Sequence, residues 1–326
     1  MSNQPPIEVP QGAIRLNTDS QKLEFYAQDR WHEMATDTPT LDGGARAVSQ
    51  PSTPSTNVLD FITIASQGNA QDFGDAASKA GGRHGAASRT RGLFAGGGTP
   101  GRLDAIEFIT FSSTGNGQNF GDLTQVGAGG GQMGLSNQTR GVFGGRTTPG
   151  NSNTIDYVTI ASTGDAIDFG DQGNNQGGMN CFASPTRGIM GGAHPGRTPR
   201  IEFITISTTG NSQEFGDLID SMELMGSSSS ATRGVWMGGR DSQGPNSQHV
   251  QYIQIQTLGS AIDFGQLIAA KDDLGGCSDS IRALAYGGGS NVIEYITLAT
   301  GGNAVDFGDG QTASGYTSLS NGHGGL

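Results

Sequence analysis

The chain has few cysteines, little positive charge and no long apolar run, and each shortage excludes a class of protein. Two cysteines among 326 residues cannot build a disulfide framework. A net charge of −12 disfavours sequence-independent nucleic-acid binding, which needs a basic surface. No apolar run is long enough to span a membrane, and the first residues do not resemble a signal peptide. We therefore expect folding in a reducing cytoplasm, with Cys181 and Cys277 as buried free thiols.

Helical periodicity is also missing, whereas glycine is abundant. No stretch shows the 3.6-residue apolar period of an amphipathic helix. Glycine accounts for 56 residues and charged residues for only 15% of the chain, a composition typical of short strands joined by tight turns. The sequence therefore predicts an all-β protein.

A unit of 18 residues, seen as IEFITISTTGNSQEFGDL at Ile201–Leu218, occurs six times. In every copy an aromatic residue lies twelve positions before a second aromatic, which glycine follows. The apolar start predicts a strand covered on both faces, T-G-N predicts a tight reversal, and D-F-G predicts a returning strand. The first aromatics are Phe61, Phe108, Tyr157, Phe203, Tyr252 and Tyr295, and the second are Phe73, Phe120, Phe169, Phe215, Phe264 and Phe307.

Two further recurring pieces precede each hairpin. One is a T-R-G segment, degenerate in two copies, and the other is a Gly-rich apolar stretch. Four antiparallel strands in roughly 48 residues, repeated in series, are typical of β-propeller blades. We predict a six-bladed β-propeller of four-stranded blades over residues 40–326. Because the first repeat lacks its first strand, residues 315–326 are expected to pair with the Arg46 strand and close the ring.

The order of the pieces resembles the kelch family, whose blades carry an apolar strand ending in two glycines and then a strand with an aromatic. Phenylalanine stands here where kelch blades usually carry tryptophan. The resemblance implies a propeller and does not by itself imply an enzyme. The paired glycines are Gly96-Gly97, Gly144-Gly145, Gly191-Gly192, Gly238-Gly239 and Gly287-Gly288.

Residues 1–39 lie outside the repeats and predict an extended arm followed by a small β-hairpin or meander. About twenty of these residues resemble a β-motif found near the ends of bacteriophage virion proteins, particularly tail fibres. The resemblance implies attachment to a neighbouring virion protein, and a solvent-facing cap on the main domain is the alternative. We expect Phe25, Tyr26 and Trp31 to be buried against the partner chain. The matching residues are Gly12, Ile14, Arg15, Asn17, Thr18, Lys22, Leu23, Glu24, Phe25, Tyr26 and Trp31.

No pattern of residues predicts catalysis, a cofactor or a metal site. The five histidines are scattered without metal-ligand spacing, and there is neither a G-x-S-x-G motif nor a P-loop. The repeated aspartates are expected at turns and strand ends, since calcium needs six to eight converging oxygens. The repeated arginines are expected to bind carbonyls or a carboxylate of the next blade, and an anion held at the axis is the alternative. These arginines are Arg46, Arg91, Arg140, Arg187, Arg233 and Arg282.

Loop lengths predict the binding face. The spacing from arginine to the first aromatic varies from 13 residues (Arg282 to Tyr295) to 19 (Arg233 to Tyr252), whereas the T-G-N turn is constant. Variable loops on a rigid scaffold commonly carry recognition. The longest such loop is polar and suits a glycan or a polar protein surface. Its candidate binding residues are Arg240, Asp241, Gln243, Asn246 and His249.

These patterns lead to a first hypothesis of a bacteriophage virion structural protein, a tail appendage that forms a homo-oligomer or is present in multiple copies. It would bind neighbouring virion proteins or a host surface glycan or protein, without nucleic acid or membrane insertion. The alternative is a non-enzymatic, kelch-like carbohydrate- or protein-binding module of a bacterium. An enzyme with its active site in the central channel is a third hypothesis.

Overall fold

The computed structural model contains two units, Met1–Leu41 and Asp42–Leu326. All regular elements of the described residues are β-strands, which confirms the all-β class, and no helix among them could cross a membrane. The structure describes residues 9–17, 22–33, 45–52, 54–98, 101–127, 134–147, 149–173, 177–194, 196–242, 244, 246–313 and 315–326.

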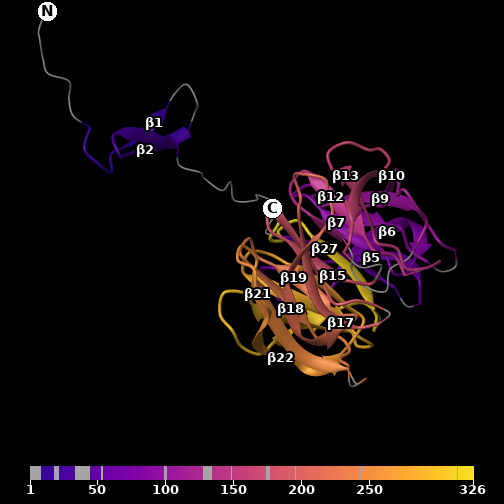
Figure 1. The fold of residues 1–326 in the computed structure, drawn as a ribbon. Helices are drawn as coiled ribbons and strands as arrows, with labels where there is room; N and C mark the ends of the chain where they lie inside the picture. The colour runs from indigo at the N-terminus through magenta and orange to yellow at the C-terminus, as the bar shows by residue number, and fades with distance from the viewer. Residues whose placement is uncertain are drawn as a thin grey trace, which may run out of the picture. The chain divides into compact units, whose positions relative to one another are not determined.

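The first unit contains a three-stranded antiparallel sheet in the order β1-β2-β3 (Figure 1, indigo). Its strands are β1 (Ile14–Asn17), β2 (Lys22–Ala27) and β3 (Arg30–Glu33). Gln28 and Asp29 join β2 to β3, and both have positive φ, 51° and 59°. Two successive positive φ angles are typical of a tight type I′ hairpin.

The second unit contains six four-stranded antiparallel sheets, numbered here in chain order. Sheet 1 is β27 (Tyr316–Ser320), β4 (Arg46–Pro51), β5 (Thr56–Thr63) and β6 (Gln71–Ala80). Sheet 2 is β7 (His84–Ala87), β8 (Arg91–Ala95), β9 (Ala105–Thr110) and β10 (Gln118–Asp122). Sheet 3 is β11 (Gly134–Ser136), β12 (Arg140–Gly144), β13 (Thr154–Thr159) and β14 (Ile167–Asp171).

The last three sheets follow the same plan. Sheet 4 is β15 (Asn180–Ala183), β16 (Arg187–Gly191), β17 (Thr198–Thr205) and β18 (Gln213–Met222). Sheet 5 is β19 (Gly226–Ser229), β20 (Arg233–Met237), β21 (Ser247–Gln254) and β22 (Ile262–Lys271). Sheet 6 is β23 (Leu274–Ser278), β24 (Arg282–Gly287), β25 (Val292–Thr297) and β26 (Val305–Asp309). The described chain therefore has seven sheets, one more than the number of repeats, because the N-terminal strands form their own sheet.

The first strands of the six sheets contact one another in order, giving a propeller-like arrangement (Figure 1). Strand β7 contacts β11, β11 contacts β15, β15 contacts β19, β19 contacts β23, β23 contacts β27, and β27 contacts β7. In sheet 1, β27 pairs antiparallel with β4, so that Leu319 faces Val48. The predicted pairing of the C-terminal strand with the Arg46 strand is confirmed.

The hydrophobic core is divided into six clusters of buried side chains. In each cluster residues of two neighbouring sheets interdigitate; one, for example, contains Val142 of sheet 3 and Met190 of sheet 4. No cluster needs a large apolar segment, because each sheet is buried on both faces by its neighbours. This arrangement explains how a chain with only 33% hydrophobic residues can bury a core.

The twelve-residue spacing brings the two aromatics of each repeat into contact. In sheet 3 the rings of Tyr157 and Phe169 lie 5.8 Å apart at 82°, an edge-to-face packing that all six repeats share. Phe169 is the extra residue of a β-bulge, since Asp156 pairs with Asp168 and Ile155 with Gly170. The D-F-G pattern therefore specifies a bulge that points the phenylalanine into the core.

The glycine of each D-F-G permits the next sheet to approach. Gly170 has a φ of 146°, and a Cβ there would lie 2.6 Å from the carbonyl oxygen of Gly210 in sheet 4. The connection after β13, residues 160–166, lies against sheet 2, where Gly164 N donates to Phe120 O at 2.8 Å. The predicted tight T-G-N reversal is therefore wrong in length, because the connection also binds the preceding sheet.

Each repeated arginine lies between two neighbouring sheets. In sheet 4, Arg187 Nη1 donates to the carbonyl oxygens of Ile255 and Gln256 in sheet 5 at 3.0 and 3.1 Å. Its guanidinium also covers the ring of Phe203 at 4.8 Å. All six arginines bind a carbonyl of the next sheet, which confirms the predicted role.

A second series of contacts between sheets comes from buried acids that sequence reasoning missed. The second residue of each I-E-F pattern is buried, and its side chain accepts a backbone N–H from the preceding sheet. In sheet 2, for example, Glu107 Oε2 accepts from Ala77 N at 2.9 Å. The sequence signal is that this position holds only Asp, Glu or Gln. The six residues are Asp60, Glu107, Asp156, Glu202, Gln251 and Glu294.

Candidate interaction surfaces

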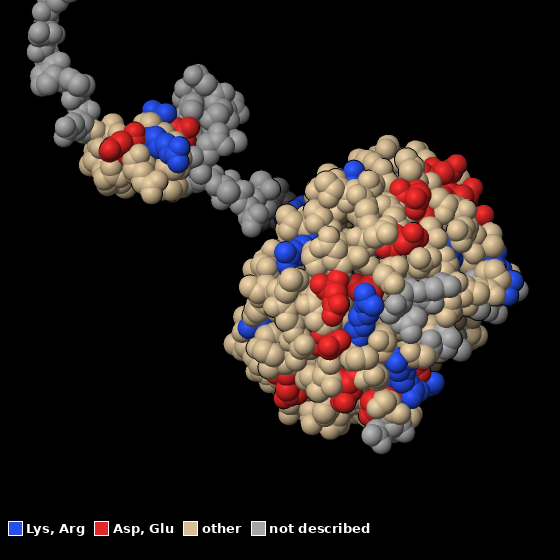
Figure 2. Space-filling model, in the orientation of Figure 1, with Lys and Arg blue, Asp and Glu red and all other residues tan. Residues whose placement is uncertain are grey.

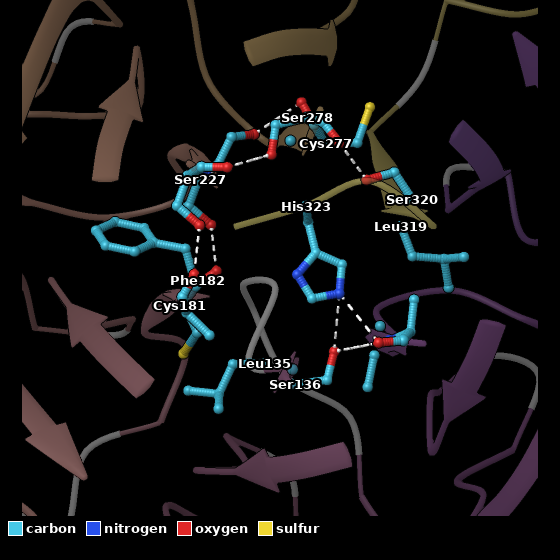
Figure 3. A pocket seen from close by; sticks show the side chains of 18 of the residues that line it. Leu135, Ser136, Cys181, Phe182, Ser227, Cys277, Ser278, Leu319, Ser320 and His323 are labelled. Carbon is cyan, nitrogen blue, oxygen red and sulfur yellow. Dashed lines mark hydrogen bonds between the residues drawn. The ribbon is translucent and has the colours of Figure 1, made fainter. Parts of the chain in front are cut away.

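The first strands of the six sheets line a small, partly open cavity of about 50 Å³ (Figure 3). Glycines let the strands approach, since a Cβ on Gly276 would lie 2.3 Å from Ser227 O. The serine hydroxyls are used between strands: Ser229 Oγ donates to Ala183 O at 2.7 Å and Ser278 Oγ to Ser229 O at 2.8 Å. A cavity of this volume accommodates a few water molecules.

His323 reaches into this cavity from the C-terminal residues (Figure 3). Gly325 N donates to its Nδ1 at 3.1 Å, so the neutral ring carries its proton on Nε2. That nitrogen lies 3.0 Å from Ala87 O and 3.2 Å from Ser136 Oγ. Burial lowers the pKa of His323 to about 4, which keeps the ring neutral at physiological pH. The residues after β27 therefore cover one end of the cavity.

The predicted recognition loop is folded against the sheets. Arg240 forms backbone bridges with Glu223 and Asn246, and Gly244 N donates to Asp241 O at 3.2 Å. His249 lies within strand β21 and is exposed. The structure thus places Arg240, Asp241 and Asn246 together in the loop and His249 beside it. Gln243 lies outside the described residues.

Charged side chains from the connections within and after sheets 4 and 5 gather around this loop. Glu223 contacts His194 Nδ1 at 2.9 Å and Arg197 Nη2 at 3.0 Å, and Arg240 Nε lies 2.6 Å from Asp272 Oδ2. Burial alone would raise the pKa of Glu223, but hydrogen bonds from His194 and Arg197 lower it. Sequence reasoning missed these partners, because only the packing of the sheets joins them.

The face of the second unit seen in Figure 2 is mostly formed by residues other than Lys, Arg, Asp and Glu, and on it several positive and negative side chains lie next to each other. Such a surface offers hydrogen-bond donors and acceptors and charges of both signs, rather than an electrostatic field of one sign. It suits a polar partner better than a highly charged one.

The N-terminal sheet places its predicted binding residues on opposite faces. Tyr26 and Trp31 face each other at 5.3 Å between ring centroids, and the Arg15 guanidinium lies 4.1 Å from the Trp31 ring. On the other face Phe25 stacks on His32 at 5.3 Å. The three aromatics therefore cannot contact one flat partner surface together.

The face that carries Phe25 is apolar and exposed. Ile14 pairs with Phe25 and Leu16 with Leu23, and the side chains of Ile14 and Leu16 are 62% and 60% exposed. Leu23 is also exposed. Sequence reasoning missed these aliphatic residues, although their alternation with polar residues in I-R-L-N and K-L-E-F is the signal of a one-sided apolar strand.

The cysteines and the comparisons with known proteins do not assign a function to these surfaces. Cys181 and Cys277 are buried free thiols, as predicted, and burial raises the pKa of both. In the part of the chain that the structure describes, no three His, Cys, Asp or Glu side chains gather as a metal site. A scan against models of protein families and a search of curated proteins give no match to this chain.

Proposed function

We propose that the second unit is a closed, kelch-like six-bladed propeller. The cyclic contacts of the first strands support closure, as do the links from sheet 6 to sheet 1. Arg282 Nη1 donates to Ile64 O at 2.9 Å, the same contact that the other arginines make between consecutive sheets. The paired glycines at the ends of the second strands support the kelch-like assignment.

We propose that the protein is a structural component of a bacteriophage virion, a tail appendage attached by its N-terminal unit. The observation that carries this proposal is the exposed apolar face of Ile14, Leu16, Leu23 and Phe25 on a three-stranded sheet. A sheet of this size with an uncovered apolar face is marginally stable alone, so a partner chain would stabilise it. Its partner is another virion protein, and the propeller acts without catalysis or a cofactor.

A protein beginning at residue 40 should fold and yet fail to enter particles. The propeller makes its core contacts within residues 42–326, so its melting temperature should change little. Incorporation is measured by mass spectrometry of purified particles. As a matched pair, Leu16→Asp should block incorporation because it places a charge on the apolar face, whereas Gln28→Asp, in the exposed turn between β2 and β3, should not. Normal incorporation of the truncated protein would disprove the attachment role.

The loop face is proposed to bind a host surface glycan or protein. Deleting residues 241–246 shortens the spacing from Arg233 to Tyr252 to that of sheet 6. The fold should survive, because these residues lie between β20 and β21, while binding to host cells should fall by about tenfold or more. Retention of fluorescently labelled protein on host cells measures the loss.

Arg89→Ala provides the control, since Arg89 is exposed in the turn between β7 and β8 at the opposite face. Loss of binding in this control with full binding of the shortened loop would place recognition on the other face. The same loop face also favours the alternative of a kelch-like carbohydrate- or protein-binding module of a bacterium. That alternative would be favoured if neither the full nor the truncated protein enters virions while glycan or protein binding stays intact.

A further inference from the structure

Six buried positions between the sheets are occupied by the second residue of each I-E-F pattern. At five of them this residue is either uncharged itself or lies near a cation. Gln251 is uncharged, and its Oε1 accepts from Ile219 N at 2.8 Å. Arg146 is the positive charge that acts on Asp156. The remaining three are ion pairs: Glu107 with Arg83 at 2.9 Å, Glu202 with Arg200 at 2.7 Å and Glu294 with Lys271 at 2.6 Å.

Asp60 is the sixth position, and no described Lys or Arg forms an ion pair with its carboxyl group. It is fully buried on β5, in the sheet that the C-terminal strand completes. Its Oδ2 accepts from Gln311 N at 3.4 Å, and among the residues that the structure describes its Oδ1 has no hydrogen-bond partner. An ionised carboxylate in this place would be a buried charge with one weak contact.

The titratable groups that face Asp60 are themselves acids. Cys277 of β23, Tyr286 of β24 and Tyr316 of β27 each interact electrostatically with its carboxyl group. Each is neutral when protonated and negative when ionised, so none can neutralise a carboxylate. Burial raises the pKa of Asp60 from its ordinary 3.8 to about 7, and the hydrogen bond from Gln311 lowers it only in part.

We propose that Asp60 is a pH-sensitive latch on the junction between the last and the first sheets. The protonated carboxyl keeps Gln311 and Tyr316 packed around it. Ionisation places an uncompensated charge beside Tyr316 and Tyr286, which weakens the hold of β27 on the first sheet. The latch belongs to this junction because the other junctions have a counter-charge or an amide at the equivalent position.

The sign of the pH effect follows from the direction of the pKa change. An acid with a pKa raised on folding stabilises the fold fully below its unfolded pKa, here 3.8, because the folded state binds the proton more tightly. This contribution decreases as the pH rises, and it is lost above about 7. The junction is therefore more tightly closed at pH 6 than at pH 8.

Asp60→Asn tests the latch, since the amide keeps the size and the acceptor for Gln311 N without the charge. The melting temperature of the variant should exceed that of the wild type by at least about 5 °C at pH 8.5 and match it near pH 4. The reciprocal variant Gln251→Glu should acquire a new loss of stability above neutral pH. Equal pH profiles of the wild type and Asp60→Asn would overturn the proposal.

Two measurements on the unaltered protein keep the test independent of whether the variants fold. Carbon-13 NMR of the Asp60 carboxyl should show a titration midpoint near 7, and a midpoint near 4 would refute the latch. Amide hydrogen exchange, corrected for the intrinsic effect of pH, should accelerate in β27 between pH 6 and 8 more than in the equivalent strand β15. Equal acceleration in both strands would also refute a local latch.

Discussion

A protein that lacks residues 315–326 is expected to lose cooperative folding of its second unit. The deletion removes β27, whose Tyr316 and Leu319 are buried in two different core clusters. Each such side chain contributes about 1.5–3 kcal/mol by burial. The deletion also leaves the edge of β4 unpaired and exposes the buried Ser49, which contacts Ser318 Oγ at 2.8 Å. Together these losses approach a typical domain stability of about 5–15 kcal/mol.

Circular dichroism melting and size-exclusion chromatography measure this loss, which should appear as a low, broad transition and soluble aggregates. The matched control deletes only residues 322–326. This shorter deletion removes His323 but keeps β27, so the sheets should still fold. An unchanged melting temperature after the longer deletion would disprove the closing role of β27.

Arg83→Met should be the most damaging single substitution between sheets 1 and 2. Arg83 and Glu107 form a bidentate pair with distances of 3.0 and 2.9 Å, and both side chains are almost completely buried. Burial alone would raise the pKa of Glu107, but the hydrogen bonds and charge of Arg83 lower it. Without the arginine an uncompensated charge remains, at a cost of about 3–5 kcal/mol in the free energy of unfolding.

Urea denaturation measures this cost, and Arg102→Met, at an exposed arginine of the same repeat, provides the control. The double variant Arg83→Met with Glu107→Gln should recover much of the loss, because the amide carries no charge. Recovery should be incomplete, since Arg83 Nε also donates to Gly96 O at 3.1 Å. A loss below about 1 kcal/mol in the single variant would contradict a stabilising ion pair.

The sequence predicts the strands and their pairing well because both are repeated. Six copies of one pattern average out the ambiguity of a single apolar run, and the missing first strand of the first repeat points to the C-terminal pairing. The length of the connection after the third strand could not be predicted. Residues such as Gly164 bind the preceding sheet, and a contact between sheets leaves no signal in a hairpin motif.

The buried acids and the surface ion pairs show a second limit of sequence reasoning. A Glu within a strand is usually exposed, so Glu107 gives no sign of its burial until Arg83 is placed beside it. The polarity of the loop that begins at Arg240 is readable, but its partner Asp272 lies beyond the next strand, in the connection from β22 to β23. In the N-terminal sheet the alternation of apolar and polar residues can be read from the sequence. The prediction that Phe25, Tyr26 and Trp31 share one surface fails because neighbouring residues of a strand face opposite sides.

The pairing of β27 with β4 also sets the order in which the molecule can be completed during synthesis. Hydrogen bonds between consecutive first strands join residues 42 to 49 positions apart, with 49 between Ala87 and Ser136, whereas Ser49 and Ser318 are 269 positions apart. Closing the longer segment costs about 1.5 kcal/mol more in chain entropy. On the ribosome, sheets 2 to 6 can form as they emerge, but β4 must wait for residues 316–320. The edge of β4 therefore stays unpaired in the nascent chain until residues 316–320 have been made. The pairing of β27 with β4 is then the slowest folding step and follows the formation of sheets 2 to 6.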